Sequence, residues 1–141
     1  EYSTGQFTDG DTHHPLANLC VPQVNDDCAL IAELSSIQYH SSVTKHEKSA
    51  LSSGEFISAI ENDLQDEIRR FVLVGFLLEH CVQSTALDLL ARLSGKEAEV
   101  IICSDLVASR SEKYTNGTVK SVMANLRNKG ITVEPWSRIQ P

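Results

Sequence analysis

The fold is decided by the stretch Phe71-Val-Leu-Val-Gly-Phe-Leu-Leu-Glu-His-Cys81-Val-Gln-Ser-Thr-Ala-Leu-Asp88. Its first four residues are apolar and lead to Gly75, a pattern typical of a fully buried parallel strand that ends at a turn. From Cys81 onward, apolar residues recur at helical spacing. The sequence therefore predicts a strand over 71–76 and a helix over 81–93, with a thiol at the junction between them.

Cys81 occupies a position at which open α/β sheets bind ligands, the carboxyl end of a buried strand and the first turn of the next helix. The amino terminus of a helix stabilises an anion, so it favours the reactive thiolate over the thiol. A structural interpretation stands beside this one, because free cysteines are among the most buried residues and often only fill core space. From residue types and position alone, both interpretations stay open.

The rest of the chain continues the alternation of strands and helices. The predicted elements are a short strand at Ser42–Lys45, a helix from the N-cap Ser53 to about Asp66, strands at 98–103 and 131–134, and a helix at 111–128. This order predicts an α/β fold, a doubly wound parallel sheet with helices on both faces. Residues 1–27 are rich in Gly, Asp, Thr, Asn and Pro and are predicted to form an extended arm or loop before a domain at 28–141 that starts with a helix at 28–37.

Composition limits the possible partners. The 141 residues are enough for one domain, and 41% of them are hydrophobic. The formal net charge of −7, without basic clusters, argues against nucleic acid or an anionic membrane as a partner. The four cysteines show no Cys-x-x-Cys spacing, which favours free thiols in a reducing, cytoplasmic setting. A disulfide between Cys20 and Cys28 stays open as the less favoured alternative.

Three segments together carry a family resemblance. Gly75 followed by Cys81-Val-x-x-Thr-Ala-x-Asp resembles the nucleophile segment of the isochorismatase-like cysteine hydrolases, which include nicotinamidases and carbamoylsarcosine amidohydrolases. Upstream, Lys45-x-x-x-Ser-Ala is similar to a segment of the family in which a strand ends at a lysine and Ser-Ala follows after three residues. Downstream, the turn Asp105-x-x-x-Ser109 is similar to the segment after the next strand. The resemblance covers roughly residues 28 to 135.

The resemblance implies a mechanism and its residues. Cys81 would be the nucleophile that attacks an amide or ureido carbon of a small molecule, and Lys45 would assist it. The backbone N–H groups of Leu77 and Cys81 would hold the oxyanion, and the Phe76–Leu77 peptide would be cis. The resemblance also implies a homo-oligomer. The alternatives are a catalytically inactive fold that binds or assembles, and, less favoured because Cys81 is retained, an isochorismatase that cleaves a vinyl ether.

One element of the family pattern has no match in this chain. Family members carry a catalytic aspartate at the end of their first strand, and the nearest candidates, Asp26 and Asp27, lie too close to Lys45 for a strand and a crossover between them. The resemblance thus predicts a domain that lacks its first strand. We expect either a complementing N-terminal segment on a missing or separate polypeptide, which is the favoured reading, or a shortened member of the family.

Other polar residues are weaker candidates. Asp11-x-His13 resembles part of a metal-binding element of nicotinamidases, and its ligand types would suit Zn, Mn or Fe. A further histidine is missing, so no metal or other cofactor is predicted, with Asp11 and His13 as weak candidates only. Asp105 follows a predicted buried strand, and we expect it to cap the next turn rather than to act in catalysis.

Overall fold

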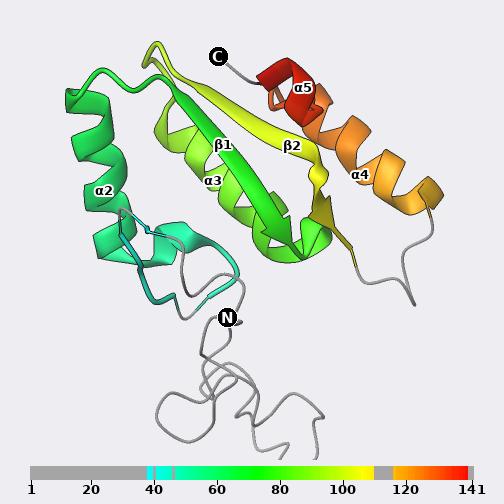
Figure 1. The fold of residues 1–141 in the computed structure, drawn as a ribbon, viewed down its shortest axis with the longest axis horizontal. Helices are drawn as coiled ribbons and strands as arrows, with labels where there is room; N and C mark the ends of the chain where they lie inside the picture. Colours follow the sequence, from blue (N-terminus) through cyan, green and yellow to red (C-terminus); the bar gives the residue numbers. More distant parts are fainter. Residues whose placement is uncertain (1–37, 40, 46, 110–115, 140–141) are drawn as a thin grey trace, which may run out of the picture.

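The computed structural model describes residues 38–39, 41–45, 47–109 and 116–139. Several sequence predictions lie outside these residues: the arm at 1–27, the helix at 28–37, the candidates Asp11 and His13, and the Cys20–Cys28 pair. The described elements, drawn in Figure 1, are in order η3 (Ala50–Ser52), α2 (Gly54–Gln65), β1 (Arg70–Phe76), η4 (Leu78–Val82), α3 (Gln83–Arg92), β2 (Glu99–Ala108), α4 (Asn116–Asn128), β3 (Thr132–Glu134) and α5 (Trp136–Ile139).

The three strands form one parallel sheet in the order β1-β2-β3. Leu73 pairs with Ile102, and Ile102 pairs with Val133, so these three side chains share one face of the sheet. An irregularity in the β1–β2 register lies between Leu73 and Gly75. Because the strands are parallel and joined through helices, the predicted α/β class is confirmed.

Helices cover the two faces of the sheet unequally. The main core joins Ile102 of β2 to Leu89 of α3 and Leu126 of α4, all at most 1% exposed. On the opposite face, Ile101 and Cys103 of β2 are covered by Ile139 of α5. Figure 1 shows α3 behind β1 and β2, with α4 and α5 near the β2 side. One face of β1 is therefore left with little cover among the described elements.

Helix α2 begins where the sequence predicts it. The Ser53 side chain accepts a hydrogen bond from the Phe56 N–H at 3.4 Å, which satisfies one of the unpaired donors at the helix start. Ile60 is buried, and Phe56 packs against the main core. In Figure 1, α2 lies beside the outer edge of β1, the edge away from β2. No helix of the described residues has the length and apolar character needed to cross a bilayer.

Two predictions about strands are wrong. Residues 42–45 are not a strand, because no described strand lies beside them to supply backbone hydrogen bonds. The prediction that the 71–76 strand is buried on both faces holds for Phe71, which is 8% exposed, but not for the other face. Val72, Val74 and Phe76 are 38%, 54% and 75% exposed, because no described helix covers this face of β1.

The remaining boundaries differ from expectation by a few residues. Strand β2 continues beyond residue 103 to Ala108, and α4 is described from Asn116, since 110–115 lie outside the described residues. Gly130 follows α4 with a φ of +95°, a left-handed conformation that favours glycine and ends the helix. The predicted end of this helix at residue 128 is confirmed.

Candidate active site

Cys81 lies in a wide turn between β1 and α3. After Gly75, whose φ is +111°, the Phe76–Leu77 peptide bond is cis, as the resemblance implied. The chain then forms the single π-helical turn η4, in which the Leu77 carbonyl accepts hydrogen bonds from the His80 and Val82 N–H groups at 3.1 and 3.2 Å. The predicted helix therefore starts with this wide turn, and the regular α-helical part begins only at residue 83. Wide turns of this kind are frequent at functional sites.

Lys45 meets the thiol of Cys81. The Lys45 Nζ atom lies 3.7 Å from the Cys81 Sγ atom, although the two residues are 36 positions apart in the chain. Both side chains are half-buried, and Nζ also donates to the Glu47 carbonyl at 3.0 Å. An ammonium group at this distance stabilises negative charge on sulfur. The structure thus brings together the two side chains that the sequence predicts for catalysis.

Thr85 connects the segments that carry these two residues. Its Oγ1 atom accepts a hydrogen bond from the Ala50 N–H at 3.0 Å, joining η3 to the first turn of α3. Ser49 is buried, and its Oγ atom accepts a bond from the Leu51 N–H at 3.2 Å. The motif residues Ser49, Ala50 and Thr85 therefore hold the Lys45 segment against the helix that follows Cys81. Sequence reasoning assigned no role to Thr85, although the residue is part of the quoted motif.

A cavity of about 440 Å³ adjoins the thiol. Lys45, Cys81 and Thr85 supply polar groups to its wall, and most of the other described lining residues are apolar. The apolar lining comes from η3, α2, β1, η4 and α3 and is Ala50, Phe56, Ile60, Phe71, Val72, Leu73, Val74, Phe76, Val82 and Leu89. Cys81 is therefore not enclosed in the core and has space beside its sulfur atom.

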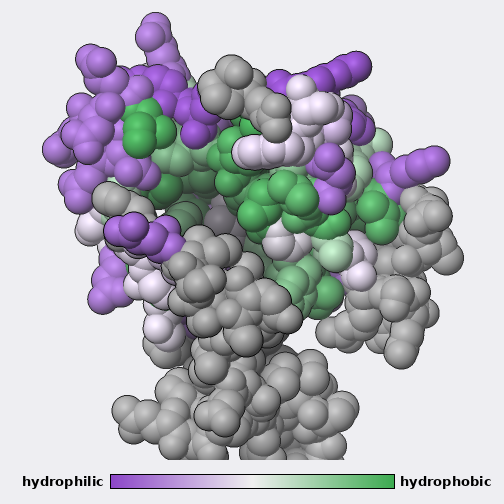
Figure 2. Space-filling view, in the orientation of Figure 1, coloured by the Kyte–Doolittle hydropathy of each residue, from purple (hydrophilic) through white to green (hydrophobic). Residues whose placement is uncertain are grey.

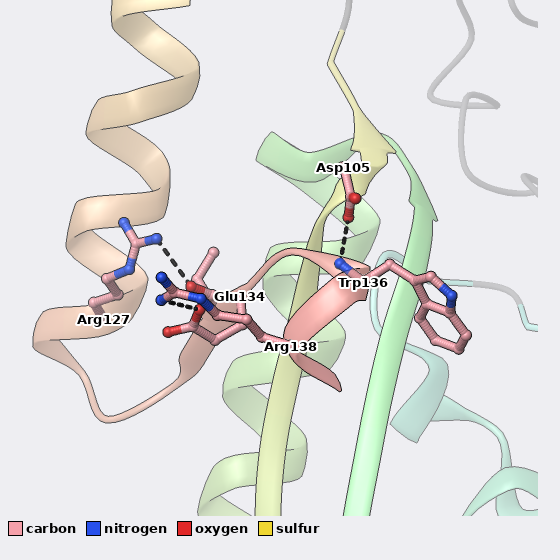
Figure 3. A network of polar contacts seen from close by, with 6 residues as sticks. Asp105, Arg127, Glu134, Trp136 and Arg138 are labelled. Carbon is pink, nitrogen blue, oxygen red and sulfur yellow. Dashed lines mark hydrogen bonds and ion pairs between the residues drawn. The ribbon is translucent and has the colours of Figure 1, made fainter. Parts of the chain in front are cut away.

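Asp105 belongs to a separate polar network, drawn in Figure 3. Its Oδ1 atom accepts hydrogen bonds from the Cys103 thiol at 3.1 Å and from the Trp136 N–H at 2.9 Å. The bond from Cys103, and then that from Trp136, lowers the pKa of the Asp105 carboxyl. Burial of Cys103 raises the pKa of its thiol, and the Asp105 carboxylate raises it further. Asp105 thus caps the start of α5, a structural role, although the helix it caps lies far along the chain.

The other predicted site residues have different outcomes. Leu77 lies at the cis peptide and Cys81 in the following turn, so both N–H groups belong to the same loop, and their use as an oxyanion hole stays a prediction. Asp11 and His13 lie outside the described residues. Within the described ranges, no group of three or more His, Cys, Asp and Glu side chains could hold a metal ion.

Solved structures share this fold. An isochorismatase family protein from Desulfovibrio vulgaris is 21% identical, with a TM-score of 0.71 over 86% of this chain and 57% of that protein. An isochorismatase-like hydrolase from Alkaliphilus metalliredigens is 25% identical, with a TM-score of 0.62 over 77% of this chain and 54% of that protein. A zinc complex of the pyrazinamidase of Pyrococcus horikoshii is 19% identical, with a TM-score of 0.51, over 68% of this chain and 48% of that protein. The chain spans about half the length of these structures.

The match to a family model extends to residues outside the part of the chain that the structure describes. A comparison with curated proteins found no match. The family model of the isochorismatase domain, in contrast, matches residues 6–134, which is most of the sequence. Together with the parallel sheet and the thiol at the end of β1, this match leads to one conclusion: the chain belongs to the isochorismatase family.

Proposed function

We propose that this chain carries the nucleophile of a hydrolase that cleaves an amide or ureido C–N bond of a small molecule. The observation that carries the proposal is the 3.7 Å approach of Lys45 Nζ to Cys81 Sγ at the carboxyl end of β1. A thiol beside an ammonium group, with open space next to it, has the properties of a cysteine nucleophile rather than of a core residue.

The proposed reaction passes through a thioester. The Cys81 sulfur attacks the carbonyl carbon, a C–S bond forms, and the negative charge on the carbonyl oxygen is held by the N–H groups of Leu77 and Cys81. The C–N bond then breaks, and the proton that left sulfur is transferred to the nitrogen. Water hydrolyses the thioester, releasing a carboxylic or carbamic acid and restoring the thiol. The base that carries the proton would be the family's aspartate, which the sequence does not identify here.

Similarity to named relatives supports this class of substrate. The Alkaliphilus metalliredigens relative is named a hydrolase, and a relative from Streptococcus mutans, 23% identical with a TM-score of 0.50, is named a pyrazinamidase/nicotinamidase. Pyrazinamide and nicotinamide are small aromatic amides. By analogy, we propose a small amide as the substrate, acted on in a reducing compartment, the cytoplasm, in which the Cys81 thiol is preserved.

A second candidate is an inactive member of the family that serves in binding or assembly. The observation that favours it is the sequence itself, in which no catalytic aspartate of the family pattern can be recognised. In this case Cys81 and Lys45 would keep their places for packing only. The two candidates differ in whether a substrate becomes covalently attached to sulfur.

The test is hydrolysis of small amides with trapping of the intermediate. The protein would be incubated with nicotinamide, pyrazinamide and ureido acids, with ammonia release measured and intact mass recorded after acid quenching. We expect ammonia release with at least one compound, an added acyl mass on Cys81, and loss of both in Cys81→Ala. Cys103→Ala, which removes the buried thiol, should keep them. Absence of both signals from the folded protein would favour the inactive candidate.

A further inference from the structure

Strand β2 contains extra residues near its carboxyl end. Its pairing with β1 passes from Leu73 opposite Ile102 to Gly75 opposite Val107, so β1 advances by two residues while β2 advances by five. Three residues of β2 are therefore in excess, and the segment 103–106, called the bulge below, must leave the regular pairing with β1. Figure 1 shows this irregular course of β2 just before its arrowhead. Bulges often re-aim side chains next to active sites.

The carboxyl end of β1 is held by the residues of β2 that follow the bulge. Gly75 pairs with Val107, which also packs against the main core, and Phe76 pairs with Ala108. Packing on the other face contributes little, because the Phe76 side chain is 75% exposed. Figure 2 shows hydrophobic surface across the middle of this view, where β1 runs in Figure 1. The turn that carries Cys81 follows β1 directly, so its base depends on where Val107 and Ala108 lie.

Polar contacts, rather than packing, anchor the bulge. Leu106 is 50% exposed, so its side chain gives this segment little support. The Asp105 Oδ1 atom accepts hydrogen bonds from the Cys103 thiol at 3.1 Å and from the Trp136 N–H at 2.9 Å. The first bond closes the bulge on itself, and the second, drawn in Figure 3, ties it to the start of α5. Helix α5 is fixed on the sheet in turn, because Ile139 packs against Cys103.

We propose that Asp105 is a positioning residue for Cys81. By fixing the bulge to α5, Asp105 sets where Val107 and Ala108 pair with the end of β1. The end of β1 in turn sets where the following turn presents the Cys81 sulfur to Lys45. Asp105 acts through the backbone and takes no part in the chemistry itself. The inference rests on the proposed function only in taking Cys81 as the nucleophile.

The test is the rate at which iodoacetamide alkylates Cys81 at pH 7, with the modified thiol assigned by peptide mass spectrometry. This rate reports the surroundings of the sulfur whether or not an amide is cleaved, so its outcome is distinct from that of the hydrolysis test. Asp105→Ala should react about two- to threefold more slowly, because the sulfur no longer lies where Lys45 stabilises its negative charge. Asp105→Asn keeps an acceptor oxygen and should recover most of the rate.

A double variant shows whether the effect of Asp105 passes through Lys45. If Asp105 acts by placing the sulfur beside the ammonium group, its loss has no further effect once that group is gone. The combination of Lys45→Met with Asp105→Ala should therefore react as slowly as Lys45→Met alone, and no more slowly. A role of Asp105 in stability alone would make the two effects multiply.

Matched variants separate the anchor from its surroundings. Trp136→Pro removes the N–H whose hydrogen bond Asp105 accepts, at the first position of a helix where proline is tolerated, and should slow labelling as Asp105→Ala does. Trp136→Ala removes the ring but keeps the N–H, so it should react at the unmodified rate. Leu93→Ala creates a cavity in the main core at the end of α3; it should lower the melting temperature and leave the labelling rate unchanged.

Four results would overturn the proposal. The first is labelling of Cys81 in Asp105→Ala at the unmodified rate. The second is a double variant slower than Lys45→Met by the full factor of Asp105→Ala. The third is equal labelling of Trp136→Pro and Trp136→Ala. The fourth is a slowing by Leu93→Ala as large as that by Asp105→Ala, which would assign the effect to lost stability.

Discussion

Replacement of Lys45 by methionine tests the central feature of the site. At 3.7 Å, a unit positive charge stabilises a unit negative charge by about 1 kcal/mol in water and by about 4 kcal/mol at an effective dielectric constant of 20. Both groups are half-buried, so we take a value in the lower part of this range, about 1.4 kcal/mol, for the stabilisation of negative charge on sulfur that the substitution removes. A sulfur anion that is less stabilised is also more nucleophilic, which offsets about half of this effect on the rate of attack.

The expected result is about a threefold slower alkylation of Cys81 in Lys45→Met. The assay is labelling with iodoacetamide at pH 7, followed by peptide mass spectrometry to assign the modified thiol. Cys103 is an internal reference, because its buried thiol should react far more slowly than Cys81. Lys48→Met removes an exposed lysine nearby and should leave the rate unchanged. If Lys45→Met reacts as fast as the unmodified protein, or faster, the charge of Lys45 does not act on the sulfur.

The structure leads to three further predictions. Thr85→Val leaves the Ala50 N–H without its acceptor, and we expect the free energy of unfolding by urea to fall by about 1–3 kcal/mol. We also expect slower labelling of the Cys81 thiol. Unchanged stability would argue against the hydrogen bond. Ile102→Ala creates a core cavity and should cost about 2–5 kcal/mol in the same measurement, whereas a cost below about 1 kcal/mol would contradict the packing described. The pKa of the Asp105 carboxyl is lowered in the folded protein, so its contribution to stability is complete above its ordinary pKa near 4 and is lost as the pH falls through the lower folded value. The melting temperatures of the unmodified protein and of Asp105→Asn should therefore differ at pH 7 and converge near pH 2. A difference that stays constant with pH would count against the role of the charge.

Local patterns in the sequence were sufficient for most elements. Ser53 is the type of residue that caps a helix, and the run after Arg70 is apolar and β-branched, so α2 and β1 follow from the chain alone. The strand expected over 42–45 failed for a physical reason, since strand propensity cannot be realised without a neighbouring strand. Half of β1 is exposed although its sequence is that of a buried strand, because no described helix covers that face.

The sequence by itself determined the family, the candidate nucleophile and the candidate cation, because the motif residues lie close together along the chain and keep a characteristic spacing. Only the tertiary structure decided that Lys45 Nζ reaches Cys81 Sγ, that Thr85 ties their segments together, and that a largely apolar cavity adjoins the thiol. The first two of these features join residues 36 and 35 positions apart, and all three depend on how helices and strands pack rather than on local preference. Asp105 is a further example. Its place after a buried run of the sequence indicates a capping residue, but only the folded chain shows that it caps the helix that begins at Trp136.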